Sequence, residues 1–134
     1  MSAAILAMEF GLVLQIMIVA VYWPLIHSDV ILSIAEGEVI AYWITILIHS
    51  WPFFAVTLNV LVSQVVFIYC HYRYMILVGI VYALTNYSAT KLKGKPLYKF
   101  LHWEDQTSII ISLSLLSATV FFFLALSFAI NTNK

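Results

Sequence analysis

Three long stretches of this chain carry no Asp, Glu, Lys or Arg. The longest lies between Glu38 and Arg73 and spans 34 residues, and residues 10–26 and 108–130 flank it on either side. In a bilayer a charged group is costly, and each backbone amide must be paired within its own segment. The pattern therefore predicts an all-α integral membrane protein, a bundle of transmembrane helices.

The limits of these stretches predict four transmembrane helices in one domain that covers residues 1–134. We expect the helices at about residues 4–26, 40–69, 74–90 and 108–130. The central stretch is too short for two spans of about 20 residues each with a turn between them, so it is read as one long tilted helix. Pro52 lies inside this helix and is expected to kink it.

Composition agrees with this class and excludes others. Hydrophobic residues make up 64% of the chain and charged residues 9%, whereas a soluble domain carries about 25% charged residues. Six basic and six acidic residues cancel, so no net positive charge attracts nucleic acid. The single cysteine, Cys70, excludes an internal disulfide and argues against a thiolate metal site.

Four lysines gather in the predicted loop between the third and fourth helices. They are Lys91, Lys93, Lys95 and Lys99, and the opposite side of the membrane would hold only Arg73 and Lys134. Under the positive-inside rule this difference favours an inward-facing loop and outward-facing termini. The four lysines are also expected to attract anionic lipid headgroups. A solvated loop without lipid contacts is the simpler alternative.

The most patterned part of the chain begins at His49 and ends at Trp103. Its elements are Tyr72-Arg73-Tyr74, Gly79, Tyr82, Asn86-Tyr87 and Gly94-Lys-Pro-Leu-Tyr98-Lys-Phe-Leu101-His-Trp103, preceded by Val21-Tyr22-Trp23. This pattern resembles the second half of the androgen-induced and rolling-stone group of polytopic membrane proteins. The resemblance covers residues 19–105 and implies a family fold of about six helices, of which this chain would supply the last four.

Some androgen-induced members hydrolyse fatty-acid esters of hydroxy fatty acids. They use a Thr nucleophile from the first half and a pair of histidines three residues apart, of which the second is catalytic. In this chain His49 matches the first histidine, and Pro52 stands at the place of the second. Rolling-stone-like members also lack the second histidine, so the resemblance implies the non-enzymatic branch.

The four histidines raise the question of haem, which two histidines on adjacent helices can ligate. His27, His71 and His102 fall at predicted helix ends or in loops, and none shares the depth of His49, so no cofactor is expected. An unpaired imidazole at that depth would be costly. We therefore expect His49 to be a neutral side chain bonded across helices to Asn59, a serine or the backbone. A general base or a ligand is the alternative.

Polar and small side chains inside the spans predict where helices pack against each other or against partner chains. Such groups contribute about 0.6–2 kcal/mol each in lipid, and packing is favoured over a substrate path or a catalytic serine. The chain contains no Gly-x-Ser-x-Gly elbow. The predicted contact residues are Asn59, Ser63, Gln64, Asn86, Ser108, Ser112, Ser114 and Ser117.

Two functions remain open. The first is a non-catalytic accessory subunit of a larger membrane complex, for example an energy-transducing complex of the mitochondrial inner membrane, with other membrane subunits and phospholipids as partners. The second is a degenerate lipid ester hydrolase with His49 as the base. A transporter or channel is less favoured because the spans show no pattern of paired intramembrane charges or broken helices.

Overall fold

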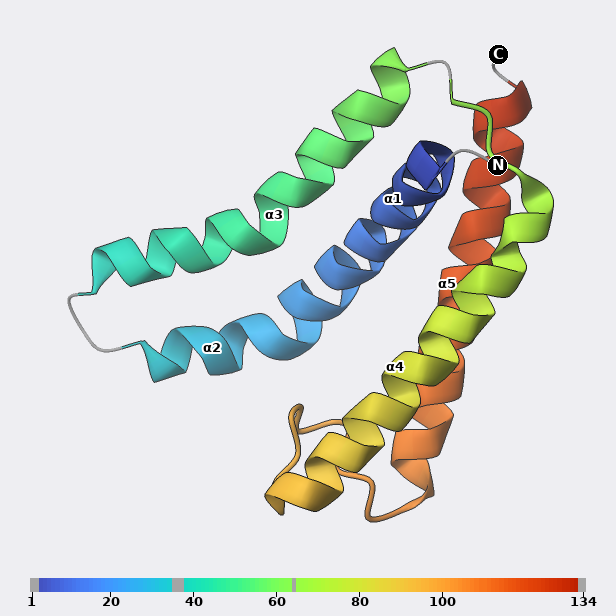
Figure 1. Cartoon of the computed structure of the whole chain (residues 1–134). Helices are drawn as coiled ribbons and strands as arrows, with labels where there is room; N and C mark the ends of the chain where they lie inside the picture. The colour runs from blue at the N-terminus through green and yellow to red at the C-terminus, as the bar shows by residue number, and fades with distance from the viewer. Residues whose placement is uncertain (1–2, 35–37, 64, 133–134) are drawn as a thin grey trace. The chain divides into compact units, whose positions relative to one another are not determined.

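The computed structural model describes residues 3–34, 38–63 and 65–132, and it is almost entirely helical (Figure 1). These residues include no β-strand, so the predicted all-α class is confirmed. In chain order the elements are α1 (Ala3–Val21), the π-helical turn η1 (Tyr22–Ile26), α2 (His27–Ser33), α3 (Val39–Val62), the 3-10 turn η2 (Tyr69–His71), α4 (Tyr72–Lys93) and α5 (Gln106–Thr132).

The described residues contain four helical runs that are long and apolar enough to cross a membrane. They are Ala3–Leu32, Val39–Val62, Tyr69–Lys93 and Gln106–Thr132. A helix of 20 residues rises about 30 Å, the thickness of the hydrocarbon core. The prediction of a multi-pass helical membrane protein with four spans is therefore confirmed by length and composition.

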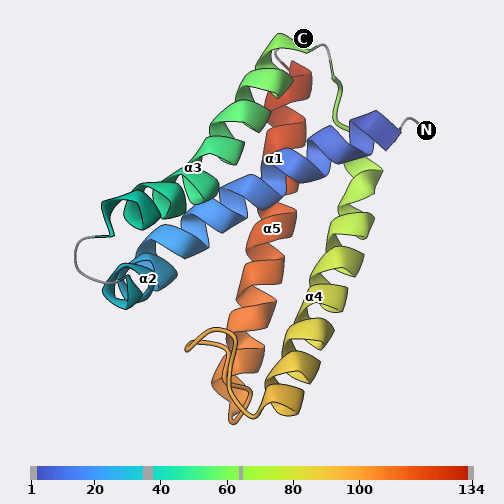
Figure 2. The ribbon, with the colours of Figure 1, turned by 60° about the vertical axis from the view of Figure 1, so that its left-hand side comes forward.

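The chain forms two compact units that divide between Val66 and Phe67. In the first unit α1 packs along α3, and in the second α4 packs along α5. Figures 1 and 2 both show that the two helices of each pair run in opposite directions. Each unit is thus a helical hairpin. The expected single domain stays a prediction.

The first span continues beyond its predicted end at residue 26. Pro24 has no N–H, and its ring crowds the carbonyl one turn earlier, so it interrupts the regular hydrogen bonding of the α-helix there. The chain widens into η1, where the backbone N–H of His27 donates to the carbonyl of Tyr22. It then continues as α2 to Ser33. A π-helical turn accommodates the proline without ending the helix.

The second span ends at Val62, seven residues before its predicted end at Tyr69. Ser63 is already extended, with φ −86° and ψ 153°. Beyond it the backbone of Phe67 is bound by the side chain of Asn131. Its N–H donates to Asn131 Oδ1 at 3.0 Å, and its carbonyl accepts from Nδ2 at 2.8 Å. These two bonds replace helical hydrogen bonds, so the chain can leave the helix.

The helices α4 and α5 lie within three residues of the predicted limits of the last two spans. α4 ends at Lys93, and the following Gly94 has a left-handed φ of 65°, as is common for a glycine that closes a helix. α5 begins after Asp105, whose Oδ1 accepts the backbone N–H of Thr107 at 2.8 Å. This is the bond of an N-cap residue. Residues 94–105 form the connecting loop.

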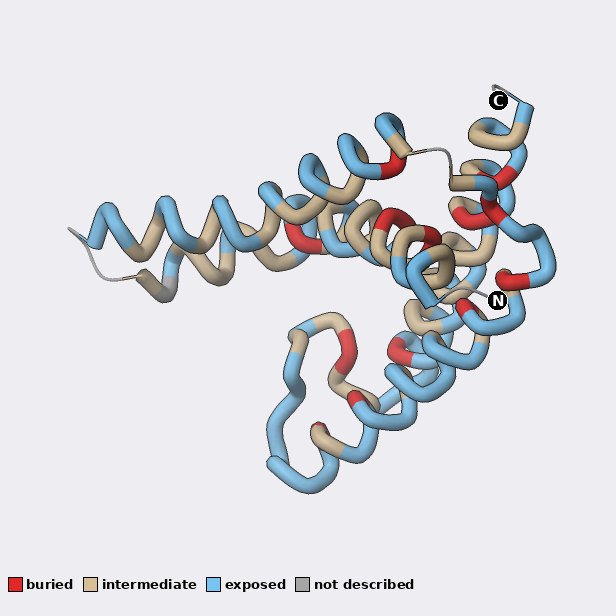
Figure 3. Tube along the Cα trace, turned by 45° about the horizontal axis from the view of Figure 1, so that its top comes forward, coloured by how far each residue is buried: buried red, intermediate tan, exposed pale blue. Residues whose placement is uncertain are grey.

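Little of the chain is buried. Figure 3 shows buried residues scattered along helices that are mostly exposed or half-buried. In α3 only Val60 is buried. Broad apolar surfaces of this kind are unfavourable in water but suit contact with lipid or other membrane helices. The buried hydrophobic residues are Leu12, Val13, Tyr22, Val60, Phe67, Met75, Leu101 and Phe123.

Candidate functional site

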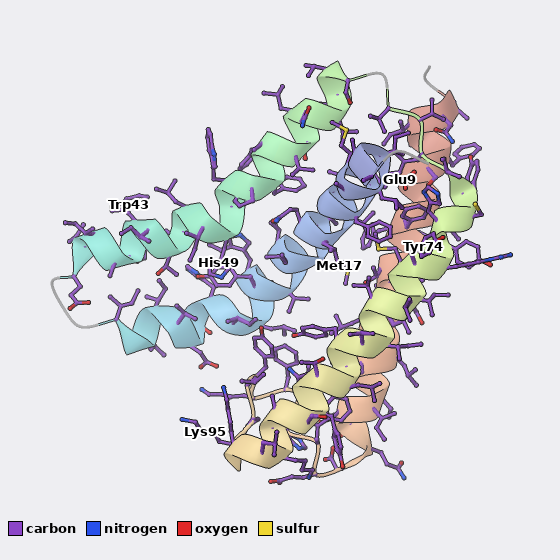
Figure 4. The ribbon with its side chains drawn as sticks, viewed as in Figure 1. Glu9, Met17, Trp43, His49, Tyr74 and Lys95 are labelled. Atoms are coloured by element: carbon purple, nitrogen blue, oxygen red, sulfur yellow. The ribbon has the colours of Figure 1, made fainter. Side chains whose placement is uncertain are left out.

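The aromatic rings of Tyr22 and His49 stack face to face across the first hairpin. Their centroids lie 3.7 Å apart and their planes differ by 6°. Tyr22 is 2% exposed, and Figure 4 shows His49 on the side of α3 that faces the α1–α2 run. Pro24 and Pro52 lie two and three residues after the stacked residues, so the contact forms beside a proline in each helical run.

The ring nitrogen Nδ1 of His49 lies 2.8 Å from the backbone carbonyl of Thr45, one turn earlier in α3. Because a carbonyl oxygen only accepts, Nδ1 carries a proton, and the lone pair of the neutral imidazole is on Nε2. Among the described residues His49 makes no hydrogen bond to Asn59 or a serine, and its bond to the backbone, the third expected partner, lies within its own helix rather than across helices. The contact across the hairpin is the stack with Tyr22.

His27 joins the same cluster from the start of α2. Its Nδ1 lies 3.2 Å from the hydroxyl of Tyr22, and its ring lies 4.5 Å from that of Trp23. The prediction that His27 marks a helix end was wrong because α2 follows η1 without a break. Tyr22 thus contacts two of the four histidines. We call Tyr22, His27 and His49 the Tyr22 cluster.

The chemistry open to the Tyr22 cluster is that of an imidazole acceptor beside a phenol. Within residues 3–34, 38–63 and 65–132 no serine or threonine hydroxyl hydrogen-bonds to His49, so a nucleophile–base pair is not assembled there. No group of three or more His, Cys, Asp or Glu side chains among these residues could hold a metal ion. In this geometry the cluster chiefly joins the two helices of the first hairpin.

A second polar cluster lies at the loop end of the other hairpin and centres on Trp103. The indole N–H donates to Asn86 Oδ1 at 2.7 Å, the backbone N–H donates to Ser108 Oγ at 2.8 Å, and the carbonyl accepts from Lys91 Nζ at 3.1 Å. Trp103 has a φ of 59°, which costs about 1–3 kcal/mol for such a residue. The three bonds hold it there, and we call these four residues the Trp103 network.

Two polar atoms beside this network have no hydrogen-bond partner among the described residues. They are Asn86 Nδ2 and Thr90 Oγ1, both buried and one turn apart on α4. Tyr82, one turn before Asn86, hydrogen-bonds to Tyr98 of the loop and lies near the Asn86 amide, although Nδ2 does not reach hydrogen-bond geometry. The loop is thus tied to α4 through both Tyr98 and Trp103.

The predicted packing residues fall into three groups. Asn86 and Ser108 are buried and serve the Trp103 network within the chain. Asn59, Ser114 and Ser117 are exposed, whereas Ser63 and Ser112 are half-buried. Gln64 lies outside the described residues. The close approach of α4 to α5 comes instead from Gly79, where a Cβ would lie 2.5 Å from Leu116 Cδ1.

The four predicted headgroup lysines, Lys91, Lys93, Lys95 and Lys99, are all exposed. Lys91 is held by the Trp103 carbonyl and by the ring of Tyr87, 5.8 Å away. Lys93 and Lys95 make no contact of this kind among the described residues. The structure therefore separates one lysine with a packing role from two that point to solvent or lipid.

Asp105 at the end of this loop has a pKa below its ordinary value. Desolvation is the largest single cause and raises the pKa, but the hydrogen bonds from Thr107 and Ser108 and the interaction with nearby His102 together lower it by more. Each of these contacts favours the carboxylate. The Asp105 carboxylate therefore caps the start of α5 rather than pairing with the lysines.

Comparison of the chain with protein-family models, with curated proteins and with solved structures finds no match. The resemblance to the androgen-induced and rolling-stone group therefore rests on the residues of the motif alone. The function of the chain must be inferred from its surface and its two polar clusters.

Proposed function

We propose that this chain is a non-catalytic accessory subunit of a larger membrane protein complex. The observation that carries the proposal is the outer face of α3, which is apolar except for Asn59. This face has the properties of a surface that packs against another membrane helix.

The outer face of α3 forms a continuous stripe at helical spacing. Trp43, Leu47, Trp51, Phe54 and Leu58 follow each other at intervals of three or four residues, and each is more than half exposed. Figure 4 shows Trp43 on the side of α3 that faces away from the α1–α2 run. Large aromatic and aliphatic side chains in one stripe can contact either lipid tails or a partner helix.

Asn59 favours the partner helix. Its side chain is exposed and makes no hydrogen bond within the part of the chain that the structure describes. An amide left unpaired in hydrocarbon costs several kcal/mol, whereas a bond to a neighbouring helix contributes about 0.6–2 kcal/mol. A second subunit with an amide or hydroxyl at the same depth would satisfy it.

The second hairpin offers a comparable face. Ser114 and Ser117 are exposed on α5, and neither hydroxyl has a hydrogen-bond partner among the described residues. The chain has a mass of 15.2 kDa and little of it lies outside the spans. A small subunit of this kind suits an assembly with many membrane chains, and an energy-transducing complex of the mitochondrial inner membrane is our specific proposal.

The test is isolation of the tagged chain from its source membrane in mild detergent, followed by mass spectrometry of the proteins that co-isolate. We expect a large particle with a fixed set of membrane subunits that fractionates with mitochondria. Asn59→Leu should reduce the yield of these subunits several-fold. Thr45→Val is the matched control, because the Thr45 hydroxyl already bonds the Ala41 carbonyl of its own helix. Migration of the wild type as a lone 15.2 kDa chain would refute the proposal.

A second proposal, the lipid ester hydrolase, is favoured by one observation at His49. The bond from Nδ1 to Thr45 leaves Nε2 as a free base, as a general base requires. The nucleophile would then come from the first half of the androgen-induced fold, carried by another chain. Labelling of the isolated complex with a lipid-mimetic fluorophosphonate that disappears in His49→Ala would support this function, and absence of labelling in the wild type would end it.

A further inference from the structure

The loop between α4 and α5 lies at the membrane surface because both helices that flank it are spans. α4 has 22 residues and α5 has 27, so each is long enough to cross a hydrocarbon core of about 30 Å. The loop side chains therefore lie at the depth of the phospholipid headgroups. This placement follows from the second hairpin alone and does not depend on the proposed function.

The last turn of α4 and the loop together, residues 91–105, carry a net positive charge. Between residues 91 and 105 there are four lysines and two acidic residues, which gives a formal charge of +2. One of the acids, Asp105, is held at the start of α5 by Thr107. Lys93 and Lys95 are exposed and have no hydrogen bond or ion pair among the described residues.

Apolar side chains alternate with these lysines and are also exposed. Leu92, between Lys91 and Lys93, is 89% exposed, and Leu97 is 46% exposed. Figure 4 shows Lys95 extending outward from the loop. A lysine beside an exposed leucine can place its ammonium group against a phosphate while the leucine enters the acyl boundary.

The loop is held in this position from both sides. Trp103 ties it to α4 and α5, Tyr98 ties it to Tyr82, and Leu101 is 2% exposed. Next to the two free lysines, a Cβ at Gly94 would meet nothing within 4 Å. The ammonium groups are therefore presented by an anchored backbone with open space around the turn.

We propose that the end of α4 and this loop, with Lys93 and Lys95 as the principal contacts, form a docking surface for an anionic phospholipid leaflet. Each lysine near a negatively charged surface contributes an attraction that falls off within a Debye length. The exposed leucines add contact with the acyl chains. The surface prefers lipids with a net negative headgroup over zwitterionic lipids of the same chain length.

The experiment measures the lipid preference of the full chain purified in mild detergent. The protein is titrated with phosphatidylglycerol or with phosphatidylcholine of identical acyl chains, and bound lipids are counted by native mass spectrometry. We expect a preference for phosphatidylglycerol in the wild type that falls roughly tenfold in the double variant Lys93→Gln/Lys95→Gln. High salt should also weaken it.

The matched control is Arg73→Gln/Lys134→Gln, which removes two positive charges outside residues 91–105, Arg73 in the first turn of α4 and Lys134 after the end of α5. This variant should keep the wild-type preference, and equal thermal midpoints in phosphatidylcholine show that both variants fold. A preference that survives in the loop variant, or that falls equally in the control, overturns the proposal. If soluble glycerol phosphate at the same concentration displaced the bound phosphatidylglycerol, the site would bind the phosphoester group alone. That result would also contradict a docking surface for a lipid leaflet.

Discussion

The side-chain amide of Asn131 binds both backbone polar groups of Phe67, 64 residues earlier in the chain. An amide offers a donor and an acceptor in the same arrangement as a backbone peptide group. At the end of α5 it therefore pairs with a segment that has left the helix. The rings of Phe67 and Phe123, tilted by 32° with centroids 6.0 Å apart, pack beside it. This contact closes the second hairpin at the end away from the lysine loop.

Replacement of Asn131 should destabilise the second hairpin. Asn131→Ala leaves the N–H and carbonyl of Phe67 unpaired in a part-buried position, which costs about 1–3 kcal/mol. The thermal midpoint in detergent measures the loss. Thr132→Ala is the control, because the Thr132 hydroxyl bonds the Phe128 and Ala129 carbonyls of its own helix, and it should change the midpoint little. Equal midpoints for the two variants would contradict this role.

The two glycines at helix contacts should respond differently to a methyl group. At Gly79 an added Cβ lies 2.5 Å from Leu116 Cδ1, so the leucine must move, and we expect Gly79→Ala to cost about 1–2 kcal/mol. At Gly11 the nearest atom, Val56 Cγ1, is 3.6 Å away, which is ordinary contact. Gly11→Ala should therefore leave the stability unchanged or slightly raised.

The cost of Gly79→Ala should be relieved by a smaller residue at position 116, because Leu116 Cδ1 is the atom that the added Cβ would meet. The double variant Gly79→Ala/Leu116→Ala is expected to show a favourable coupling energy in a double-mutant cycle of thermal midpoints. Additive effects of the two substitutions would show that α4 and α5 do not approach at this pair.

The indole N–H of Trp103 is expected to matter more than its ring. Trp103→Phe keeps an aromatic ring but leaves Asn86 Oδ1 buried without a donor, at a cost of about 1–3 kcal/mol. Trp43→Phe is the matched control, because Trp43 is 56% exposed and its indole N–H has no hydrogen-bond partner among the described residues. Thermal unfolding of the two variants in the same detergent compares them, and a larger loss at Trp43 would argue against the network.

Acidification should weaken the start of α5. The pKa of Asp105 lies below its ordinary value in the folded chain, because the desolvation that raises it is outweighed by the combined effect of Thr107, His102 and Ser108. A carboxyl with a lowered folded pKa contributes stability that is complete above its unfolded pKa and is lost as the pH falls through the folded pKa. The loss is therefore expected below about pH 4.

Asp105→Asn isolates this effect, since Asn also serves as an N-cap but does not titrate. The thermal midpoints of the wild type and the variant are compared between pH 6 and pH 3. We expect the difference between the two thermal midpoints to narrow or reverse at acid pH, because the Asp105 carboxylate of the wild type becomes protonated. A constant gap across the range would show that the Asp105 charge does not stabilise α5.

The sequence was sufficient to predict the number and type of spans, because a helix that crosses the hydrocarbon core of a bilayer requires a long segment without charged residues. It was insufficient for the end of α3. Val65, Val66 and Ile68 are apolar enough to continue a span, and the residue that binds this segment is Asn131, which is distant in sequence. Tertiary contacts of this kind leave no local pattern.

The Tyr22 cluster was missed for a related reason. His49 was singled out because it lies in a span, but its stack with Tyr22 depends on the π-helical turn that Pro24 produces. Tyr22 and His27 are five residues apart, which is the hydrogen-bond spacing of a π-helical turn. This spacing was the one feature of the sequence that could have indicated the contact between them. Similarly, the sequence did not indicate the left-handed backbone of Trp103, because a bulky residue such as tryptophan rarely adopts a positive φ.

The central claim is that α4 crosses a membrane and places its two ends on opposite sides. The chain offers a natural reporter in Cys70, its single cysteine, which is exposed at the start of this span. In sealed vesicles an impermeant maleimide should label either Cys70 in the wild type or the new thiol in Cys70→Ser/Lys95→Cys, but not both, until the vesicles are permeabilised. Labelling of both proteins in intact vesicles, with no increase on permeabilisation, would contradict the account.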